Sequence, residues 1–88
     1  MESMSLKIEK VILPALGEDI TEAAVAAWLV STGVQVNKDE DIVELVTDKA
    51  VFNVPAPVDG IVKEIYHAEG SRVPIGATLA LIEAKKIG

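Results

Sequence analysis

The sequence of 88 residues contains no cysteine and only three aromatic residues, one each of Trp, Tyr and Phe. Without cysteine there is no disulfide framework, no thiolate nucleophile and no cysteine-bound metal. Any sulfur chemistry must therefore arrive on a group attached to the chain. A domain of this length buries roughly two-thirds of its unfolded surface. With so few rings, we expect a core of Val, Ile, Leu and Ala, and no deep substrate cleft beside it.

Long apolar runs and an excess of positive charge are also missing. The longest uncharged apolar run, residues 23–30, is too short to cross a bilayer. The N-terminus lacks the basic start and the apolar stretch of a signal peptide. A formal net charge of −6 disfavours nucleic acid and anionic membrane surfaces as partners, because both repel an acidic protein. We expect a soluble acidic module that binds neither.

Alternation of apolar and polar residues predicts β-strands at three places. Residues 6–13, 41–46 and 50–54 alternate or nearly alternate, and they are rich in β-branched side chains. Pro14 ends the first strand because proline has no N–H to donate to a ladder. Residues 15–21 are then expected to form a loop.

A polar Thr-Asp-Lys separates the second strand from the third. Asp48 favours a turn here, since its side chain can bond to its own backbone. A tight hairpin at this point places Lys49 at its tip, far from any core. From composition alone, such a lysine is either a solvated surface charge or an amine held out for attachment.

The segment 21–31 is ambiguous between helix and strand. It is rich in alanine, the best helix former, and Val25, Trp28 and Leu29 have helical spacing. An internal repeat argues against a helix, because a shift of 37 residues places apolar residues on apolar residues and glycine on glycine. The matched pairs are Val25 with Val62, Trp28 with Ile65, Gly33 with Gly70, Val36 with Val73, Ile42 with Leu79 and Leu45 with Ile82.

The second copy of this repeat favours a strand in both. Residues 60–66 are β-branched and suit a strand, so we predict a strand over residues 22–30 as well. Pro14-Ala15 matches Pro55-Ala56 at a shift of 41, which gives the first half four extra loop residues. Two similar halves of about four short strands predict an all-β fold: a flattened β-barrel or sandwich of two four-stranded antiparallel sheets with pseudo-two-fold symmetry.

The repeat also predicts which side chains form the core. The ten apolar residues of the matched pairs should pack together from both halves. Trp28 is therefore assigned to the core rather than to an exposed stacking platform. His67 has no second ligand nearby and is read as a loop histidine, not a metal ligand.

The hairpin and its surroundings resemble a known family. Asp48-Lys49-Ala50 is followed by Pro-Ala-Pro at 55–57 and by Gly60, eleven residues after the lysine. Fitting residues also precede and follow: Leu13-Pro14-Ala15-Leu16-Gly17-Glu18, Glu69-Gly70, Val73, Gly76 and Leu79. Together, over residues 8–83, they resemble the lipoyl domain of the 2-oxo acid dehydrogenase complexes, in the biotinyl/lipoyl-attachment family with its barrel-sandwich hybrid fold.

The resemblance implies a swinging-arm carrier and not an enzyme. Lipoic acid would be joined through an amide to Lys49. The arm would accept an acyl group by reductive acylation from a 2-oxo acid decarboxylase, deliver it to coenzyme A at an acyltransferase core, and be re-oxidised by dihydrolipoyl dehydrogenase. A reducible cyclic disulfide suits this cycle, and tethering raises the effective concentration at each partner. A lipoate-attaching enzyme is a fourth implied partner.

Roles for neighbouring residues follow from the same resemblance. Asp48 and Ala50 flank Lys49 in the turn. Gly60 is expected across from the hairpin, where the missing Cβ lets the backbone pack closely; an ordinary turn glycine is the alternative. No catalytic residue and no metal ligand are implied.

The acidic loop is expected to lie beside the lysine. Glu18 and Asp19 would contribute there to recognition by the decarboxylase, with a merely solvated loop as the alternative. Val46 departs from the family, which often has an acidic residue three positions before the lysine, and this would weaken recognition by a lipoylating enzyme. Ala50 is more typical of pyruvate-type than of 2-oxoglutarate-type domains.

Two other classes stay open. Biotinyl carrier domains share the fold and a hairpin lysine, but they typically place methionine on both sides of it. Here the neighbours are Asp48 and Ala50, and the two methionines are at positions 1 and 4. A structural or adaptor module of the same fold would leave Lys49 unmodified.

The predicted domain covers residues 6–84. Residues 1–5 are expected to be a disordered or foreign start, and residues 85–88 a tail or the beginning of a linker. Because the hairpin joins the two halves, both ends should lie opposite Lys49. We expect a monomeric domain in the cytoplasm, or in the mitochondrial matrix of a eukaryote.

Overall fold

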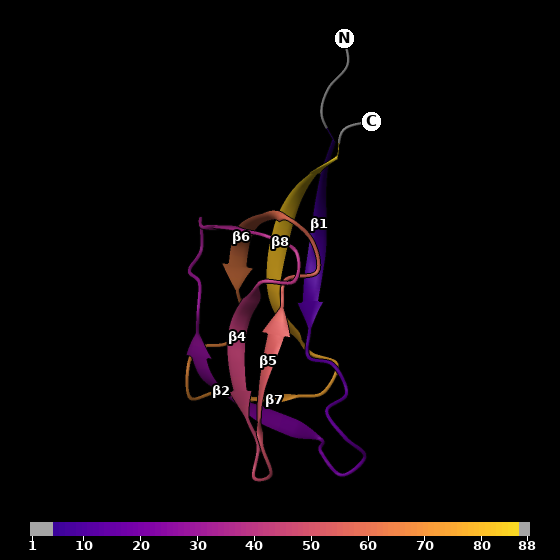
Figure 1. Ribbon diagram of the computed structural model, residues 1–88, viewed down its shortest axis with the longest axis vertical. Helices are drawn as coiled ribbons and strands as arrows, with labels where there is room; N and C mark the ends of the chain where they lie inside the picture. The colour runs from indigo at the N-terminus through magenta and orange to yellow at the C-terminus, as the bar shows by residue number, and fades with distance from the viewer. Residues whose placement is uncertain (1–4, 87–88) are drawn as a thin grey trace.

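The computed structural model describes residues 5–86 and contains eight β-strands and no helix in that range (Figure 1). The strands are β1 (Ser5–Ile12), β2 (Glu22–Trp28), β3 (Gln35–Val36), β4 (Asp41–Val46), β5 (Val51–Pro55), β6 (Gly60–Ile65), β7 (Arg72–Pro74) and β8 (Thr78–Lys86). No helix of the described chain is long and apolar enough to cross a membrane. The predicted strand at 22–30 is confirmed, although it ends at Trp28.

The strands form two antiparallel sheets of four strands each. One has the order β1-β8-β6-β3 and the other β5-β4-β2-β7. The sheets pack face to face and are not joined into a closed barrel, so the flattened sandwich is the alternative that is confirmed. Each half of the chain contributes two strands to each sheet, and exchanging β1–β4 with β5–β8 converts one strand order into the other.

Matching hydrogen bonds show that the predicted repeat is structural. The Val25 amide donates to the Ser71 carbonyl at 2.9 Å. Its repeat partner, the Val62 amide, donates in the same way to the Val34 carbonyl at 3.0 Å, and Val34 is the repeat partner of Ser71. Gly33 and Gly70 both adopt a positive φ, of 86° and 91°, which favours glycine. The alanine-rich β2 is a strand because it pairs on both sides, with β4 and β7, and this pairing outweighs alanine's helix propensity.

The first strand follows a different shift from the one predicted. The Leu13 amide donates to the Ala77 carbonyl, and the Ala56 amide donates to the Glu40 carbonyl. Because Glu40 and Ala77 are repeat partners, Leu13 corresponds to Ala56, a shift of 43 residues. The shift of 41 was therefore wrong, and Pro14 corresponds to Pro57. The first half carries six extra loop residues, not four.

The core lies between the two sheets and is almost entirely aliphatic. Its buried members are Val11, Leu13, Ala23, Val25, Val36, Ile42, Val43, Leu45, Val54, Ala56, Val62, Val73, Leu79, Ala80 and Ile82. Eight of the ten predicted core residues are in this group. The other two, Trp28 and Ile65, are half-buried and pack against it. Trp28 also donates from Nε1 to the His67 carbonyl at 2.7 Å, which anchors the indole at the edge of the core.

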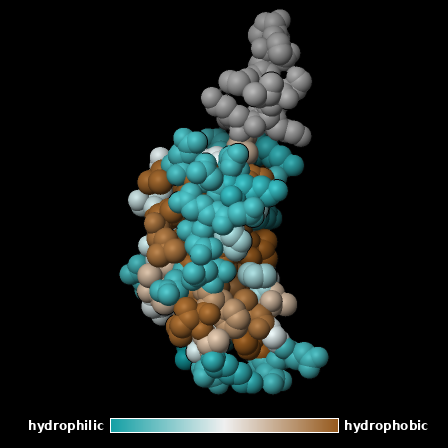
Figure 2. Space-filling model, viewed as in Figure 1, coloured by the Kyte–Doolittle hydropathy of each residue, from teal (hydrophilic) through white to brown (hydrophobic). Residues whose placement is uncertain are grey.

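The β4–β5 hairpin lies at the opposite end of the molecule from Ser5 and Lys86, the first and last described residues, which agrees with the prediction (Figure 1). β1 and β8 pair from Ser5–Lys86 inward, so the folded unit extends slightly beyond the predicted limits of 6 and 84. Residues 1–4 and 87–88, which belong to the predicted tails, lie outside the described residues. At the hairpin end, hydrophilic residues cap a band of apolar surface (Figure 2). Val46 and Val51, on the two sides of the hairpin turn, are exposed apolar residues.

Candidate functional site

The hairpin turn is closed by Thr47. Its amide donates to the Ala50 carbonyl at 2.9 Å, and its hydroxyl donates to the same carbonyl at 3.2 Å. The Thr47 Oγ1 also accepts the amides of Lys49 and Ala50, both at 3.1 Å. These bonds fix the backbone on both sides of the Lys49 side chain.

Asp48 does not shape the turn in the way that the sequence suggested. Within the described residues no hydrogen bond involves its carboxylate, and the side chain is exposed. Threonine hydroxyls can close turns by the same local bonding as aspartate, only more weakly. The signal for Thr47 was thus present in the sequence, one position before Asp48. Ala50 belongs to the turn, as predicted.

Lys49 extends from this turn into solvent. Its side chain keeps 56% of its surface exposed, and its Nζ lies 3.2 Å from the Asp19 Oδ2. Lys7 and Lys63 are equally exposed, but they lie within β1 and β6 and pair with carboxylates of the same sheet. What distinguishes Lys49 is its place on a narrow turn, where a large enzyme can approach the amine.

The loop between β1 and β2 provides the second part of the site. It reaches the same end of the molecule as the hairpin, and Asp19 is the residue that meets Lys49. A local bond from the Ile20 amide to the Gly17 carbonyl, 3.2 Å long, bends the loop. Glu18 is exposed and makes no ion pair among the residues described. The prediction that this loop lies beside the lysine is confirmed for Asp19.

Gly60 is not near the hairpin, so its predicted position was wrong. It begins β6, beside Val36, whereas the hairpin is at the other end of β5 (Figure 1). Its missing Cβ does matter, because a Cβ there would lie 2.5 Å from the Glu83 carbonyl oxygen. Close packing is thus confirmed, but the partner is β8. Residues 56–59 take the chain away from the hairpin before β6 begins.

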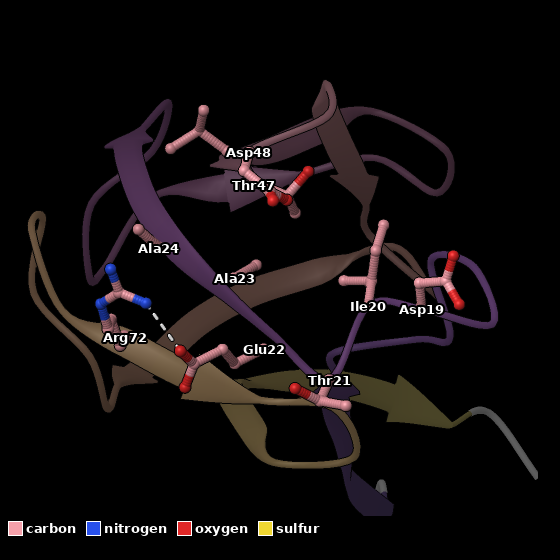
Figure 3. A pocket seen from close by; sticks show the side chains of 10 residues that line it. Asp19, Ile20, Thr21, Glu22, Ala23, Ala24, Thr47, Asp48 and Arg72 are labelled. Carbon is pink, nitrogen blue, oxygen red and sulfur yellow. Dashed lines mark hydrogen bonds and ion pairs between the residues drawn. The ribbon is translucent and has the colours of Figure 1, made fainter.

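A shallow groove of about 530 Å³ runs beside the hairpin (Figure 3). Loop and strand residues form one side, hairpin residues form the other, and small apolar side chains form the floor. The lining residues are Asp19, Ile20, Thr21, Glu22, Ala23, Ala24, Val46, Thr47, Asp48 and Arg72. The guanidinium of Arg72 pairs with the Glu22 carboxylate at 2.6 Å, so these two charges offset each other.

Taken together, the site offers an exposed primary amine on a rigid turn, one carboxylate beside it and a groove. No cluster of three potential metal ligands exists within residues 5–86. Tyr66 is the one described residue with a resolved pKa change, and it lies in the segment after β6, outside this site. The arrangement suits covalent attachment to Lys49.

Comparison with known proteins gives consistent matches. The family described as "Biotin-requiring enzyme" matches residues 9–82. The lipoamide acyltransferase component of the branched-chain alpha-keto acid dehydrogenase complex of Bacillus subtilis is 36% identical over 91% of this chain and 19% of its own length. The succinyltransferase component of the 2-oxoglutarate dehydrogenase complex of Bartonella vinsonii is 46% identical over 82% of this chain and 18% of its own length.

A third relative is the acetyltransferase component of the pyruvate dehydrogenase complex of Mycobacterium bovis, 43% identical over 82% of this chain and 13% of its own length. This chain therefore spans less than a fifth of these three relatives. Among solved structures, the lipoyl domain of the 2-oxoglutarate dehydrogenase complex from Azotobacter vinelandii is similar, with a TM-score of 0.69 and 37% identity. That match covers 83% of this chain and 92% of the other.

Proposed function

This chain belongs to the biotin/lipoyl family and is a lipoyl domain, and we propose that Lys49 is the residue on which it carries lipoic acid. The observation that carries the proposal is the Lys49 amine, exposed at the tip of a turn that the Thr47 hydroxyl closes. An amine must be accessible and reproducibly placed to be acylated by another enzyme. Both conditions are met here.

The residues present fit the group. Amide formation replaces one N–H of the free Lys49 amine with a bond to the carboxyl carbon of lipoic acid, and the leaving group departs from that carbon. Among residues 5–86, the charged neighbour within ion-pair distance is Asp19, which is itself exposed and can give way. When bound, the group supplies a reducible disulfide that can take up an acyl group and later close again.

The protein's own contribution is placement. β4 and β5 hold the turn through their ladder, which ends at the Val46–Val51 pair. Thr47 fixes the backbone at Lys49 and Ala50. The paired outer ends of β1 and β8 lie opposite, so a tether attached beyond them would leave the lysine free to reach other enzymes. A lipoyl domain of this kind is a carrier and not itself a catalyst.

The partners follow from the complexes to which the relatives belong. The relatives are acyltransferase components of 2-oxo acid dehydrogenase complexes. We infer that this domain visits a 2-oxo acid decarboxylase, an acyltransferase core and dihydrolipoyl dehydrogenase, and that a lipoate-attaching enzyme loads it. Glu18 and Asp19 are the residues we assign to decarboxylase recognition. The compartment we propose is the cytoplasm, or the mitochondrial matrix in a eukaryote.

The lipoyl reading is supported over a biotinyl one. The similar solved structure and the three acyltransferases are lipoyl proteins by their names. In addition, Asp48 and Ala50 occupy the two positions where biotinyl domains typically have methionine. The unmodified adaptor alternative is tested by the same experiment.

The test is intact mass after incubation with a lipoylating enzyme, lipoic acid and ATP. Wild type and the control Lys38→Arg, which changes another turn lysine, should each gain one lipoyl group. Lys49→Arg should gain none, because a guanidinium stays protonated and cannot act as the amine nucleophile. A gain on Lys49→Arg would assign the cargo to another lysine. No gain on any of the three proteins would favour the adaptor alternative and would direct attention to Val46.

A further inference from the structure

The groove beside Lys49 has a smaller counterpart in the other half of the molecule. The counterpart has a volume of about 310 Å³. Its lining residues are the repeat partners of five groove residues: Gln35 for Arg72, Asp59 for Glu22, Gly60 for Ala23, Ile61 for Ala24 and Glu83 for Val46. The fold thus makes two related hollows, and only the one beside the lysine is enlarged, to about 530 Å³.

Two departures from the repeat enlarge this groove. The first is on its floor, where Ala24 pairs with Val46 across β2 and β4. The equivalent pair in the second half is Ile61 with Glu83, which is bulkier and charged. The alanines that made β2 look helical in the sequence therefore leave room on the surface of the sheet.

The second departure is the longer loop between β1 and β2. Its six extra residues let Asp19 and Ile20 form a wall that the counterpart lacks. In Figure 3 the Ile20 side chain reaches from the loop toward the hairpin residues Thr47 and Asp48. Both departures therefore affect the same hollow, next to the one lysine on the hairpin.

We propose that this groove is the resting site of the lipoyl arm, an inference that rests on Lys49 as the attachment residue. The Lys49 Nζ lies 3.2 Å from Asp19, which is itself a groove residue, so the arm begins at the rim. After acylation the nitrogen keeps one N–H, which can still donate to the Asp19 carboxylate. The hydrocarbon chain and the ring then cover Ile20, Ala24 and Val46, whose apolar surface is exposed or half-buried in the empty groove.

Chemistry at the far end of the groove agrees with a neutral occupant. Glu22 and Arg72 pair with each other there and offer no net charge. The remaining rim contributes the Thr21 and Thr47 hydroxyls and the carboxylates of Asp19 and Asp48. Once Lys49 is acylated, an anionic ligand would find no unpaired cation in the groove and would be repelled by these carboxylates, whereas an uncharged apolar arm requires no cation.

The experiment compares methyl NMR spectra of three forms of the full chain: unmodified, acetylated on Lys49, and lipoylated on Lys49 with complete loading confirmed by intact mass. Acetylation removes the lysine charge without adding an arm, so the difference between the acetyl and lipoyl forms isolates the arm. We expect this difference to include the methyls of Ile20, Ala24 and Val46, with nuclear Overhauser contacts from the arm to the Ile20 methyls. Differences confined to residues 47–51, with no such contacts, would overturn the proposal.

A variant pair tests the groove directly. Ala24→Ile introduces the side chain that the second half already carries at the equivalent position, Ile61, so the strand can accommodate it. This change should abolish the contacts from the arm to Ile20. The control Ala26→Ile adds the same bulk to an exposed position of β2 outside the groove and should keep them. Contacts that persist in Ala24→Ile would contradict the proposed position.

The two proposals fail in different ways. If Lys49 gains no lipoyl mass, the proposed function is wrong and the groove has no arm to hold. If the mass is gained and the Ile20 contacts are absent from the wild type, only the resting site is wrong. The wild-type contacts are measured without any variant, so a poorly folding Ala24→Ile leaves the test intact.

Discussion

The Lys49 Nζ lies 3.2 Å from the Asp19 Oδ2, although thirty residues separate them in the chain. This pair connects the hairpin to the loop between β1 and β2, which is six residues longer than its counterpart in the second half of the repeat. Both side chains are largely exposed, at 56% and 78%, and such pairs contribute only about 0–1 kcal/mol. The contact therefore positions the amine at the groove more than it stabilises the fold.

Lys49→Arg should leave the free energy of unfolding nearly unchanged, within about 0.5 kcal/mol, because the side chain is largely exposed. Arginine also keeps the charge opposite Asp19. Urea unfolding of wild type and variant measures this, with Lys38→Arg as the matched control. A large loss in Lys49→Arg alone would mean that the lysine has a structural role.

Thr47→Ala should reduce stability by about 1 kcal/mol, because the hydroxyl bonds that close the turn are lost. It should also slow lipoylation by releasing the backbone at Lys49. Thr47→Ser keeps the hydroxyl and should restore both properties. Urea unfolding curves measure the stability, and initial rates of mass gain measure lipoylation. A serine variant that is lipoylated as slowly as the alanine variant would contradict the role of the hydroxyl.

Gly60→Ala should destabilise the domain by roughly 1–3 kcal/mol, since the new Cβ would meet the Glu83 backbone, which cannot move aside easily. The rate of lipoylation of the folded fraction should not change. Gly60 begins β6, which follows the end of β5 that is farther from Lys49. Selective loss of lipoylation with normal stability would instead support a place for Gly60 beside the hairpin.

Ile42→Ala should cost about 2–5 kcal/mol, a large part of the stability of a small domain. Its repeat partner Leu79 is equally buried, so Leu79→Ala should cost a similar amount. Ile61→Ala is the control, because that side chain is 39% exposed and its truncation leaves no closed cavity. Equal losses for Ile42 and Ile61 would show that the core is not where the two sheets meet.

Tyr66 should titrate above the usual pKa of 10.0, first because of its hydrogen bond with Glu64, then because of desolvation and repulsion by the Glu64 charge. A raised pKa in the folded state stabilises the fold below pH 10, and this contribution is lost as the pH rises through the folded-state value. Tyr66 is the chain's one tyrosine, so tyrosinate absorbance reports it alone. Glu64→Gln should lower its pKa toward 10; an unchanged titration would exclude Glu64 as the cause.

Much of the fold was determined by the sequence itself. Apolar alternation and the 37-residue repeat predicted five of the eight strands by their residues, including β2 against its alanine content. The repeat also predicted ten core positions, of which eight are fully buried. These features are readable because the two-residue period of a strand and the burial of one face are written into neighbouring residues. The repeat added a second copy in which β6 resolved what β2 left ambiguous.

The tertiary structure alone decided how distant segments meet. The sequence matched Pro14 to Pro55, whereas the carbonyls of Ala77 and Glu40 fix the register at a shift of 43. The sequence also could not place Gly60 against β8. Pairing register and loop path depend on contacts between segments that are far apart in the chain, so local patterns do not encode them.

The functional site likewise combines features that the sequence shows with features that only the tertiary structure shows. The lysine, its turn and its acidic loop could be identified from residue types and from a family resemblance. The closing role of Thr47 required a choice between two turn-forming side chains, which only their geometry could make. The groove arises where the longer loop and the small side chains of β2 meet beside the hairpin, because packing from three separate segments defines its walls and floor.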